Sequence, residues 1–179
     1  WLEIEGIASR GDFDLSQHQK FSGEDLNYFD IETKEKYLPY VIEPSCGLDR
    51  IFLAVLCDAF NEIEGGRTQE SEEKEFLLKL KSNIAPVKVA VLPLVKNKEE
   101  ITSKAKEVYN MLKDNFSCQY DETGAIGRRY RRQDEIGTPW AVTIDFESIV
   151  NNDVTLRNRD TMEQQRVKIS DLISIINEN

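Results

Sequence analysis

The chain has 179 residues, of which 40% are apolar and 31% charged, and its formal net charge is −10. This length suits one large domain or two small ones, and no apolar run approaches the roughly 20 residues of a membrane helix, so we expect no membrane partner. The acidity argues against bulk, non-specific binding of nucleic acid. It is unevenly placed, however, because residues 1–83 hold 18 acidic and 9 basic side chains, whereas residues 84–179 hold 15 and 14.

The cysteine and histidine content argues against two kinds of site. Cys46, Cys57 and Cys118 are odd in number and lack a Cys-x-x-Cys spacing, which predicts neither a disulfide framework nor a zinc site and favours a reducing cytoplasm. His18 is the only histidine, so a catalytic or metal-binding role is not expected of it. The chain shows no basic-then-apolar leader and opens on Trp1. We therefore expect a piece of a longer cytoplasmic protein.

The chain begins with a predicted strand. Trp1–Ser9 alternates acidic and apolar residues, which is the period of a strand and places Glu3 and Glu5 on one face. Residues 10–36 are polar and predict an irregular segment.

A second strand, a helix and a loop are predicted to complete the first half. Residues 37–42 read as a strand that Pro39 restricts to an edge or a bulge. Residues 51–63 are apolar nearly all round, which predicts a helix buried against a sheet. Two glycines and a charged run over 64–75 predict a surface loop. We place the boundary between two domains, 1–83 and 84–179, after this loop.

The second half alternates strands with helices. Strands are expected at 87–93, 117–120, 139–146, 154–157 and 165–169, and helices at 98–115, 126–136 and 171–177. The middle helix is expected to end at Gly137, and the last helix to have Ser170 as its N-cap. This alternation predicts an α/β fold with a mixed or parallel sheet covered on both faces.

The stretch Glu43-Pro44-Ser45-Cys46-Gly47-Leu48-Asp49-Arg50 lies where the sequence predicts that a strand gives way to a helix. The start of a helix presents free backbone N–H groups and a partial positive charge, which favour an anion. Glu43 adds a preference for an ammonium group or a metal, so the stretch predicts a small amino compound held beside a phosphate. A common strand-to-helix turn, with Arg50 pairing Asp49 or Glu43 on the surface, explains the same residues.

This stretch resembles motif 3 of the class II glycyl-tRNA synthetases, and other segments resemble the same family in the same order. Trp1–Arg10 is similar to the strand between motifs 2 and 3, and Ala85–Leu94 to the first strand of the C-terminal anticodon-binding domain. The remaining matching segments are Asp12–Leu15, Gly127–Tyr130, Asp134–Gly137, Val142–Phe146, Thr155–Arg157 and Arg159–Met162. Several matches in order are more specific than any one of them.

The resemblance implies a fold, a reaction and its partners. Residues 1–83 would be the end of the antiparallel catalytic domain, and residues 84–179 the anticodon-binding domain. The reaction would be glycine–tRNA ligation in a cytoplasmic homodimer: glycine is activated with ATP and Mg²⁺ to glycyl-adenylate and is then transferred to tRNA(Gly). Positioning and charge neutralisation carry such chemistry.

The resemblance also implies site residues. Glu43 and Arg50 would act in activation. The glycine-binding residues would be Glu43, Pro44, Ser45, Cys46 and Gly47. The ATP-binding residues would be Glu3, Ile4, Gly47, Leu48, Asp49 and Arg50, with Glu3, and more weakly Glu5, holding the Mg²⁺–ATP complex.

Simpler roles stay open for some of these residues. Carboxylates such as Glu3 and Glu5 on an alternating strand usually form its solvent face, and Ser45 before a helix is first of all a cap. Cys46 replaces the bulkier residue common in the family and could loosen the pocket wall.

For the second half, the resemblance implies recognition of unpaired anticodon bases by hydrogen bonds and stacking. The residues expected to contact the RNA are Arg128, Arg129, Tyr130, Arg132, Arg157, Asp160 and Glu163. The alternative is a solvated helix face in which Arg131 and Arg132 pair with Asp134 and Glu135.

The sequence leaves three functions to compare. A ligase fragment is favoured by Glu43, Ser45 and Arg50, because a non-catalytic nucleic-acid-binding paralogue, such as a DNA polymerase accessory subunit, has no need of a glycine pocket. An unrelated α/β metabolic domain would not match several segments in order. The family's motifs 1 and 2 would precede Trp1, so we expect the chain alone to be inactive.

Overall fold

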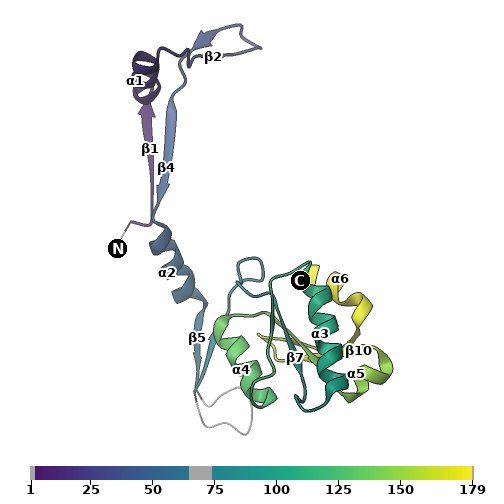
Figure 1. Cartoon of the computed structure of the whole chain (residues 1–179). Helices are drawn as coiled ribbons and strands as arrows, with labels where there is room; N and C mark the ends of the chain where they lie inside the picture. Colours follow the sequence, from purple (N-terminus) through teal and green to yellow (C-terminus); the bar gives the residue numbers. More distant parts are fainter. Residues whose placement is uncertain (1–2, 65–73, 179) are drawn as a thin grey trace. The chain divides into compact units, whose positions relative to one another are not determined.

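The computed structural model describes residues 3–64 and 74–178 and divides the chain into two compact units, Trp1–Ala54 and Val55–Asn179 (Figure 1). Most of the predicted charged loop, residues 65–73, lies outside the described residues. The predicted domain boundary after residue 83 stays a prediction.

The first unit is built on two antiparallel strands, β1 (Glu5–Gly11) and β4 (Val41–Cys46). Glu5 lies opposite Cys46 and Ala8 opposite Glu43, and the register shifts between Ser9 and Gly11. This irregularity leaves Arg10 as an extra residue in β1, as in a β-bulge.

The other elements of the first unit are short. They are α1 (Phe13–Ser22), β2 (Tyr28–Phe29), β3 (Lys36–Tyr37) and the start of α2 (Leu48–Ala59). The helix α1 was not predicted from the sequence, because its apolar residues are few. Gly23 ends it in the left-handed conformation, with its N–H donating to the carbonyl oxygen of Gln19 at 3.0 Å.

Two boundaries in this unit differ from the prediction. β1 begins at Glu5, so Glu3 precedes the strand instead of sharing a face with Glu5. β4 continues to Cys46, so Glu43, Pro44 and Ser45 belong to a strand and not to a turn. Pro44 is tolerated there because β4 pairs with one strand only and leaves an edge on which no N–H is needed.

The first unit has no buried side chain among its described residues. The helix predicted to be buried over 51–63 forms α2, which ends earlier, at Ala59, and exposes Leu48, Phe52 and Leu53 by 80%, 63% and 61%. The predicted burial of this helix is therefore seen only near its end, where Ala59 is buried and Val55 packs against the same core cluster.

The second unit contains a hairpin and a five-stranded sheet. The hairpin pairs β5 (Phe60–Ile63) with β6 (Glu75–Leu78). The sheet consists of β7 (Val89–Pro93), β8 (Cys118–Tyr120), β9 (Trp140–Ile144), β10 (Asp153–Asn158) and β11 (Gln164–Lys168) in the order β11-β10-β9-β7-β8. β7 is parallel to β8 and β9, whereas β10 is antiparallel to β9 and β11.

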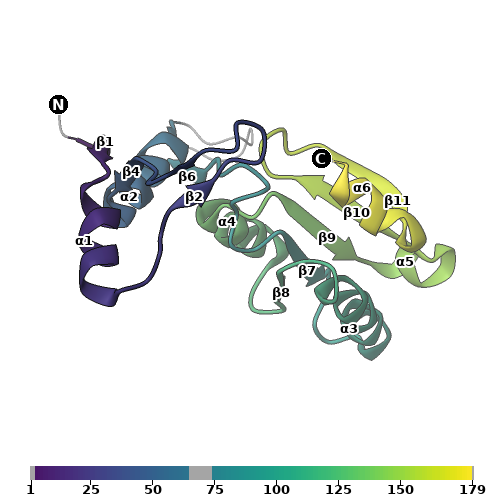
Figure 2. The ribbon, with the colours of Figure 1, turned by 90° about the horizontal axis from the view of Figure 1, so that it is seen from above.

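Helices cover both faces of this sheet (Figures 1 and 2). On one face, α3 (Glu99–Lys113) and α6 (Leu172–Asn177) pack on the core side chains of β7, β9 and β10. On the other face, α4 (Ile126–Ile136) packs on Ala90, Leu92 and Ala141 through Ile126 and Tyr130. The predicted α/β class with a mixed, doubly covered sheet is confirmed.

Two helix starts in this unit differ from the prediction. The strand expected to reach 146 ends at Ile144, because Asp145 and Ser148 form a capping box that opens α5 (Phe146–Asn151). Ser170 is not the N-cap of the last helix, since it lies within a 3₁₀ turn, Ile169–Asp171, that precedes α6.

Candidate functional site

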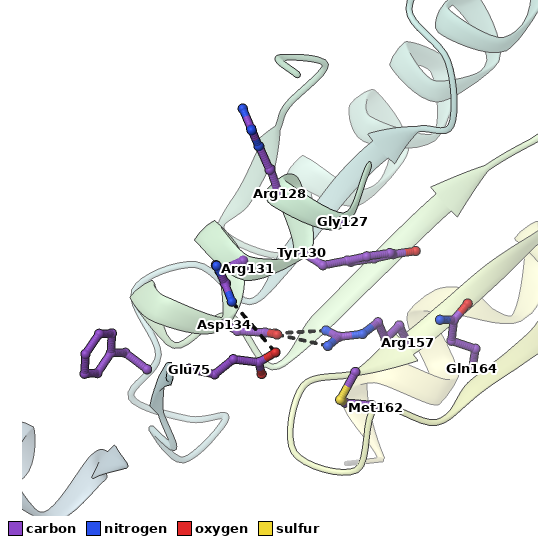
Figure 3. Close-up of a pocket in the computed structure, with 10 residues that line it drawn as sticks. Glu75, Gly127, Arg128, Tyr130, Arg131, Asp134, Arg157, Met162 and Gln164 are labelled. Carbon is purple, nitrogen blue, oxygen red and sulfur yellow. Dashed lines mark hydrogen bonds and ion pairs between the residues drawn. The ribbon is translucent and has the colours of Figure 1, made fainter. Parts of the chain in front are cut away.

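A cleft of about 360 Å³ opens on the α4 side of the sheet. It is lined by Glu75 and Phe76 of β6, by one face of α4, by Arg157 of β10, and by Met162 and Gln164 at the start of β11 (Figure 3). The α4 residues are Gly127, Arg128, Tyr130, Arg131 and Asp134. Their spacing of three and four residues is the spacing of one helix face.

An ion pair crosses the floor of this cleft. The Arg157 guanidinium donates to both carboxylate oxygens of Asp134 at 2.9 Å, and the two side chains are only 3% and 4% exposed. Such a bidentate pair fixes both side chains in position. It joins α4 to β10 and makes the floor rigid.

Tyr130 belongs to the same floor. The Arg157 guanidinium lies 4.8 Å from the centroid of its ring, and its hydroxyl is hydrogen-bonded to Thr143 Oγ1. Burial raises the pKa of Tyr130, outweighing the Thr143 hydrogen bond and the neighbouring guanidinium groups of Arg157 and Arg129. The phenol is therefore neutral at physiological pH and serves as an apolar face.

Polar groups flank the floor on two sides. On one side, Arg131 Nη2 lies 4.0 Å from Glu75 Oε1. On the other side, Gln164 offers an amide, next to the apolar side chain of Met162 (Figure 3). Arg128 is exposed and extends away from the floor (Figure 3). The cleft thus combines a rigid floor, hydrogen-bonding edges and a cation at its rim.

The structure brings three of the predicted RNA-contacting residues, Arg128, Tyr130 and Arg157, into this cleft. Arg129 does not line it. That side chain is 2% exposed and donates to the carbonyl oxygens of Pro93 and Gly124.

Arg132, Asp160 and Glu163 also lie outside the cleft lining. Arg132 binds the Asp121 carboxylate, which keeps the pKa of Asp121 below its usual range despite partial burial. Asp160 pairs with Arg159, and Glu163 is exposed. Arg131 pairs with Glu75, and Arg132 pairs with Asp121.

Seven members of the cleft were not predicted from the sequence, Phe76 and Gly127 among them. Arg131 and Asp134 could have been found from their helical spacing to Gly127 and Tyr130. Glu75, Met162 and Gln164 carried no such signal, because they reach the cleft from separate segments.

In the first unit, Glu43 projects from β4 into an ion-pair network. Arg10 Nη1 lies 3.0 Å from Glu43 Oε2, and the same guanidinium also binds Asp14 of α1. Asp14 and then Glu43 raise the pKa of Arg10, and Arg10 holds the pKa of Asp14 below its usual range. Arg10 is a partner of Glu43 that the sequence did not indicate.

The remaining residues of the motif 3 stretch surround the start of α2. Gly47 precedes the helix, and its N–H donates to the carbonyl oxygen of Ile4 at 3.3 Å. Arg50 packs along Gly47 and donates to the carbonyl oxygen of Glu3. Leu48 and Asp49 form the first turn of α2. The structure therefore brings Glu3, Ile4, Gly47 and Arg50 together.

Ser45 and Cys46 lie beside this group in β4, opposite Gly6 and Glu5. Ser45 is two residues removed from the N-cap position, which Gly47 occupies. Ser45 is therefore a strand residue, next to Pro44, and does not cap α2 as predicted. Separately, no helix among residues 3–64 and 74–178 is long and apolar enough to cross a membrane.

Known proteins resemble the chain over almost all of its length. The glycine–tRNA ligase of Streptomyces coelicolor is 51% identical over 96% of this chain, that of Acetivibrio thermocellus 52% over 97%, and that of Ruminiclostridium cellulolyticum 54% over 96%. These relatives confirm the resemblance seen in the sequence. The chain spans only 36–37% of their length.

The cleft lies mostly in a segment that a family model covers. The model described as the anticodon binding domain matches residues 88–179. These residues make up the five-stranded sheet, its helices and every part of the cleft except β6. Because this match covers more than half of the chain, the chain belongs to the anticodon binding domain family.

Proposed function

We propose that the chain is part of a glycine–tRNA ligase and that its second unit binds the anticodon loop of tRNA(Gly) in the α4 cleft. The observation that carries this proposal is the position of the cleft. It is formed largely by the segment that matches the anticodon binding domain, in a chain about half identical to glycine–tRNA ligases. The non-catalytic paralogue is not favoured, because these relatives are named as ligases.

The cleft has the features that binding of a single-stranded loop requires. Unpaired bases are read through their edges and rest against flat or apolar side chains, while cations meet the phosphates. Tyr130 and Met162 supply apolar surface, and Glu75, Arg131 and Gln164 supply polar groups. Arg128, exposed at the rim, would meet a phosphate.

The first unit would supply one wall of the site where glycine is activated. Glu43 would bind the glycine ammonium group, next to Ser45 on the same strand. Arg10, which already contacts Glu43, could also bind a carboxylate, because a guanidinium has donors on several edges. Arg50 would contact ATP and Glu3 the Mg²⁺–ATP complex. A single carboxylate suits Mg²⁺, which is usually held by one or two carboxylates together with phosphates.

The surface of the first unit supports its membership of a larger domain. Its described residues bury no side chain and expose many apolar ones, among them Phe13, Phe21, Ile42 and Phe52. Apolar surface of this extent marks an interface. We place the parent ligase in the cytoplasm as a homodimer.

The anticodon proposal is tested by titrating the 179-residue chain with a fluorescent anticodon stem–loop of tRNA(Gly). We expect it to bind more tightly than a stem–loop of the same length with an unrelated triplet. Arg128→Ala should weaken binding and lower the slope of log K against log salt concentration by about 0.7, the value for one phosphate contact to a single strand.

Lys98→Ala is the matched control, because Lys98 is an exposed cation that immediately precedes α3, on the opposite face of the sheet. It should leave affinity and salt slope unchanged. Equal affinity of the wild-type chain for both stem–loops would refute the proposal.

A further inference from the structure

The wall of the cleft that carries Glu75 comes from outside the matched family segment. Glu75 opens β6, and β6 packs against α4, whereas the family match begins only at residue 88. The hairpin of β5 and β6 therefore adds to the family's domain a carboxylate that the matched segment does not contain.

This carboxylate lies beside a guanidinium in a sheltered position. Glu75 Oε1 and Arg131 Nη2 are 4.0 Å apart, and the two side chains are 13% and 39% exposed. A carboxylate has about four acceptor positions and a guanidinium five donors, so each can hold the other and still bind a further group. The wall thus presents a hydrogen-bond acceptor next to hydrogen-bond donors.

That pattern matches one edge of cytosine. The Watson–Crick edge of cytosine offers the N4 amine as donor, followed by N3 and O2 as acceptors. The amine suits Glu75, as carboxylates accept hydrogen bonds from cytosine N4, and N3 or O2 suits Arg131. Uracil presents O4 in place of the amine, so an oxygen would face the carboxylate without a hydrogen between them, and binding would be weakened.

We propose that Glu75 determines specificity in the cleft by accepting a hydrogen bond from the N4 amine of an unpaired anticodon cytosine, with Arg131 donating to the same base. The inference rests on the proposed function: glycine codons begin with two guanines, so anticodons that pair with them carry two cytosines. It assigns the choice of base to the β5–β6 hairpin and leaves phosphate contact to Arg128.

The test compares stem–loops of tRNA(Gly) in which each anticodon cytosine is replaced in turn by uracil. With the wild-type chain, one of the two replacements should weaken binding about tenfold or more, since a good base contact discriminates by roughly 1–3 kcal/mol. With Glu75→Gln, the preference for cytosine at that position should fall to within about twofold, because the amide can also donate to uracil O4.

Glu135→Gln is the control, because it removes the same charge from an exposed position on α4 that does not line the cleft. It should keep the wild-type preference. A carboxylate also accepts from guanine, so a third stem–loop varies the first anticodon base. Sensitivity of Glu75→Gln to that base alone would overturn the assignment to cytosine.

A change in the RNA alone tests the same contact without any risk that a protein variant has misfolded. A stem–loop with 2-pyrimidinone, which lacks the amine, in place of the sensitive cytosine should bind the wild-type chain as weakly as the uracil stem–loop does. The Glu75→Gln variant should bind this 2-pyrimidinone stem–loop no more weakly than the wild-type chain does. If the wild-type chain selects the glycine stem–loop while Glu75→Gln retains full selectivity for cytosine, this inference fails and the proposed function stands. If the wild-type chain selects no stem–loop, the proposed function itself fails.

Discussion

In the second unit, buried ion pairs hold individual side chains in position. Arg157 and Asp134 are the clearest case, as both are buried and joined by two hydrogen bonds of 2.9 Å. Removing two charges from water is costly, and the pair persists because each charge satisfies the other. The dependence of folding stability on this pair is therefore best measured by replacing one of its two partners.

Asp134→Ala should lower the free energy of unfolding by about 3–5 kcal/mol, because it leaves the Arg157 guanidinium buried without its counter-ion. Urea denaturation followed by circular dichroism measures this change. Glu107→Ala, which removes the more exposed partner of the Lys104–Glu107 pair, is the control and should cost less than about 1 kcal/mol. Similar losses in both variants would contradict the role given to the buried pair.

At the scale of elements, α4 and its end position the cleft. The helix ends in a Schellman motif, in which the N–H of Gly137 donates to the carbonyl oxygen of Asp134 at 3.3 Å and that of Thr138 to Gln133 at 2.9 Å. Gly137 has a φ of 85°, and a Cβ placed on it would lie 2.7 Å from Leu80 Cδ1. The segment that follows β6 is thus packed directly on the end of α4.

Gly137→Ala should be more destabilising than Gly124→Ala. Both glycines have positive φ, which costs an L-residue about 1–2 kcal/mol. Gly124 has open space where a Cβ would lie, whereas Gly137 meets Leu80 and the carbonyl oxygen of Leu78. Thermal denaturation of the two variants separates the backbone cost from the packing cost. Equal melting temperatures would show that the segment after β6 is not tightly packed on α4.

The elements also show where sequence reasoning succeeded. The prediction of α4 over 126–136 matches its observed bounds, because a clear helical pattern ends at a glycine. The predictions missed α1 and α5, because α1 has few apolar residues and α5 is a short helix defined by its cap. Local signals therefore predicted elements with strong periodicity and failed for those that depend on a cap or on context.

At the scale of the whole molecule, the two units differ in how well they bury apolar residues. All three apolar core clusters identified among the described residues lie in residues 55–178. The first unit holds the motif 3 stretch with Glu43 and Arg50, but buries none of its described side chains. Its proposed role in activation therefore depends on a larger domain around it.

The 179-residue chain by itself should show no glycine-dependent ATP–pyrophosphate exchange, because it spans only 36–37% of the length of the glycine–tRNA ligases that it resembles. Measurable exchange by this chain would overturn the expectation. In a full-length ligase with this sequence, Glu43→Ala should raise the KM for glycine more than the KM for ATP. Equal changes in both would indicate misfolding instead of a lost ammonium contact.

The sequence by itself determined the family resemblance, the α/β class and most elements of the second half, because contiguous motifs and local periodicity encode these properties. It also indicated Arg128, Tyr130 and Arg157, which the structure brings into one cleft. Only the tertiary structure decided which charges are buried in pairs and which face the cleft. Asp134 and Arg157 are 23 residues apart, and Glu75 reaches Arg131 from a separate hairpin. Such contacts depend on how strands and helices pack in three dimensions, which no local pattern in the chain records.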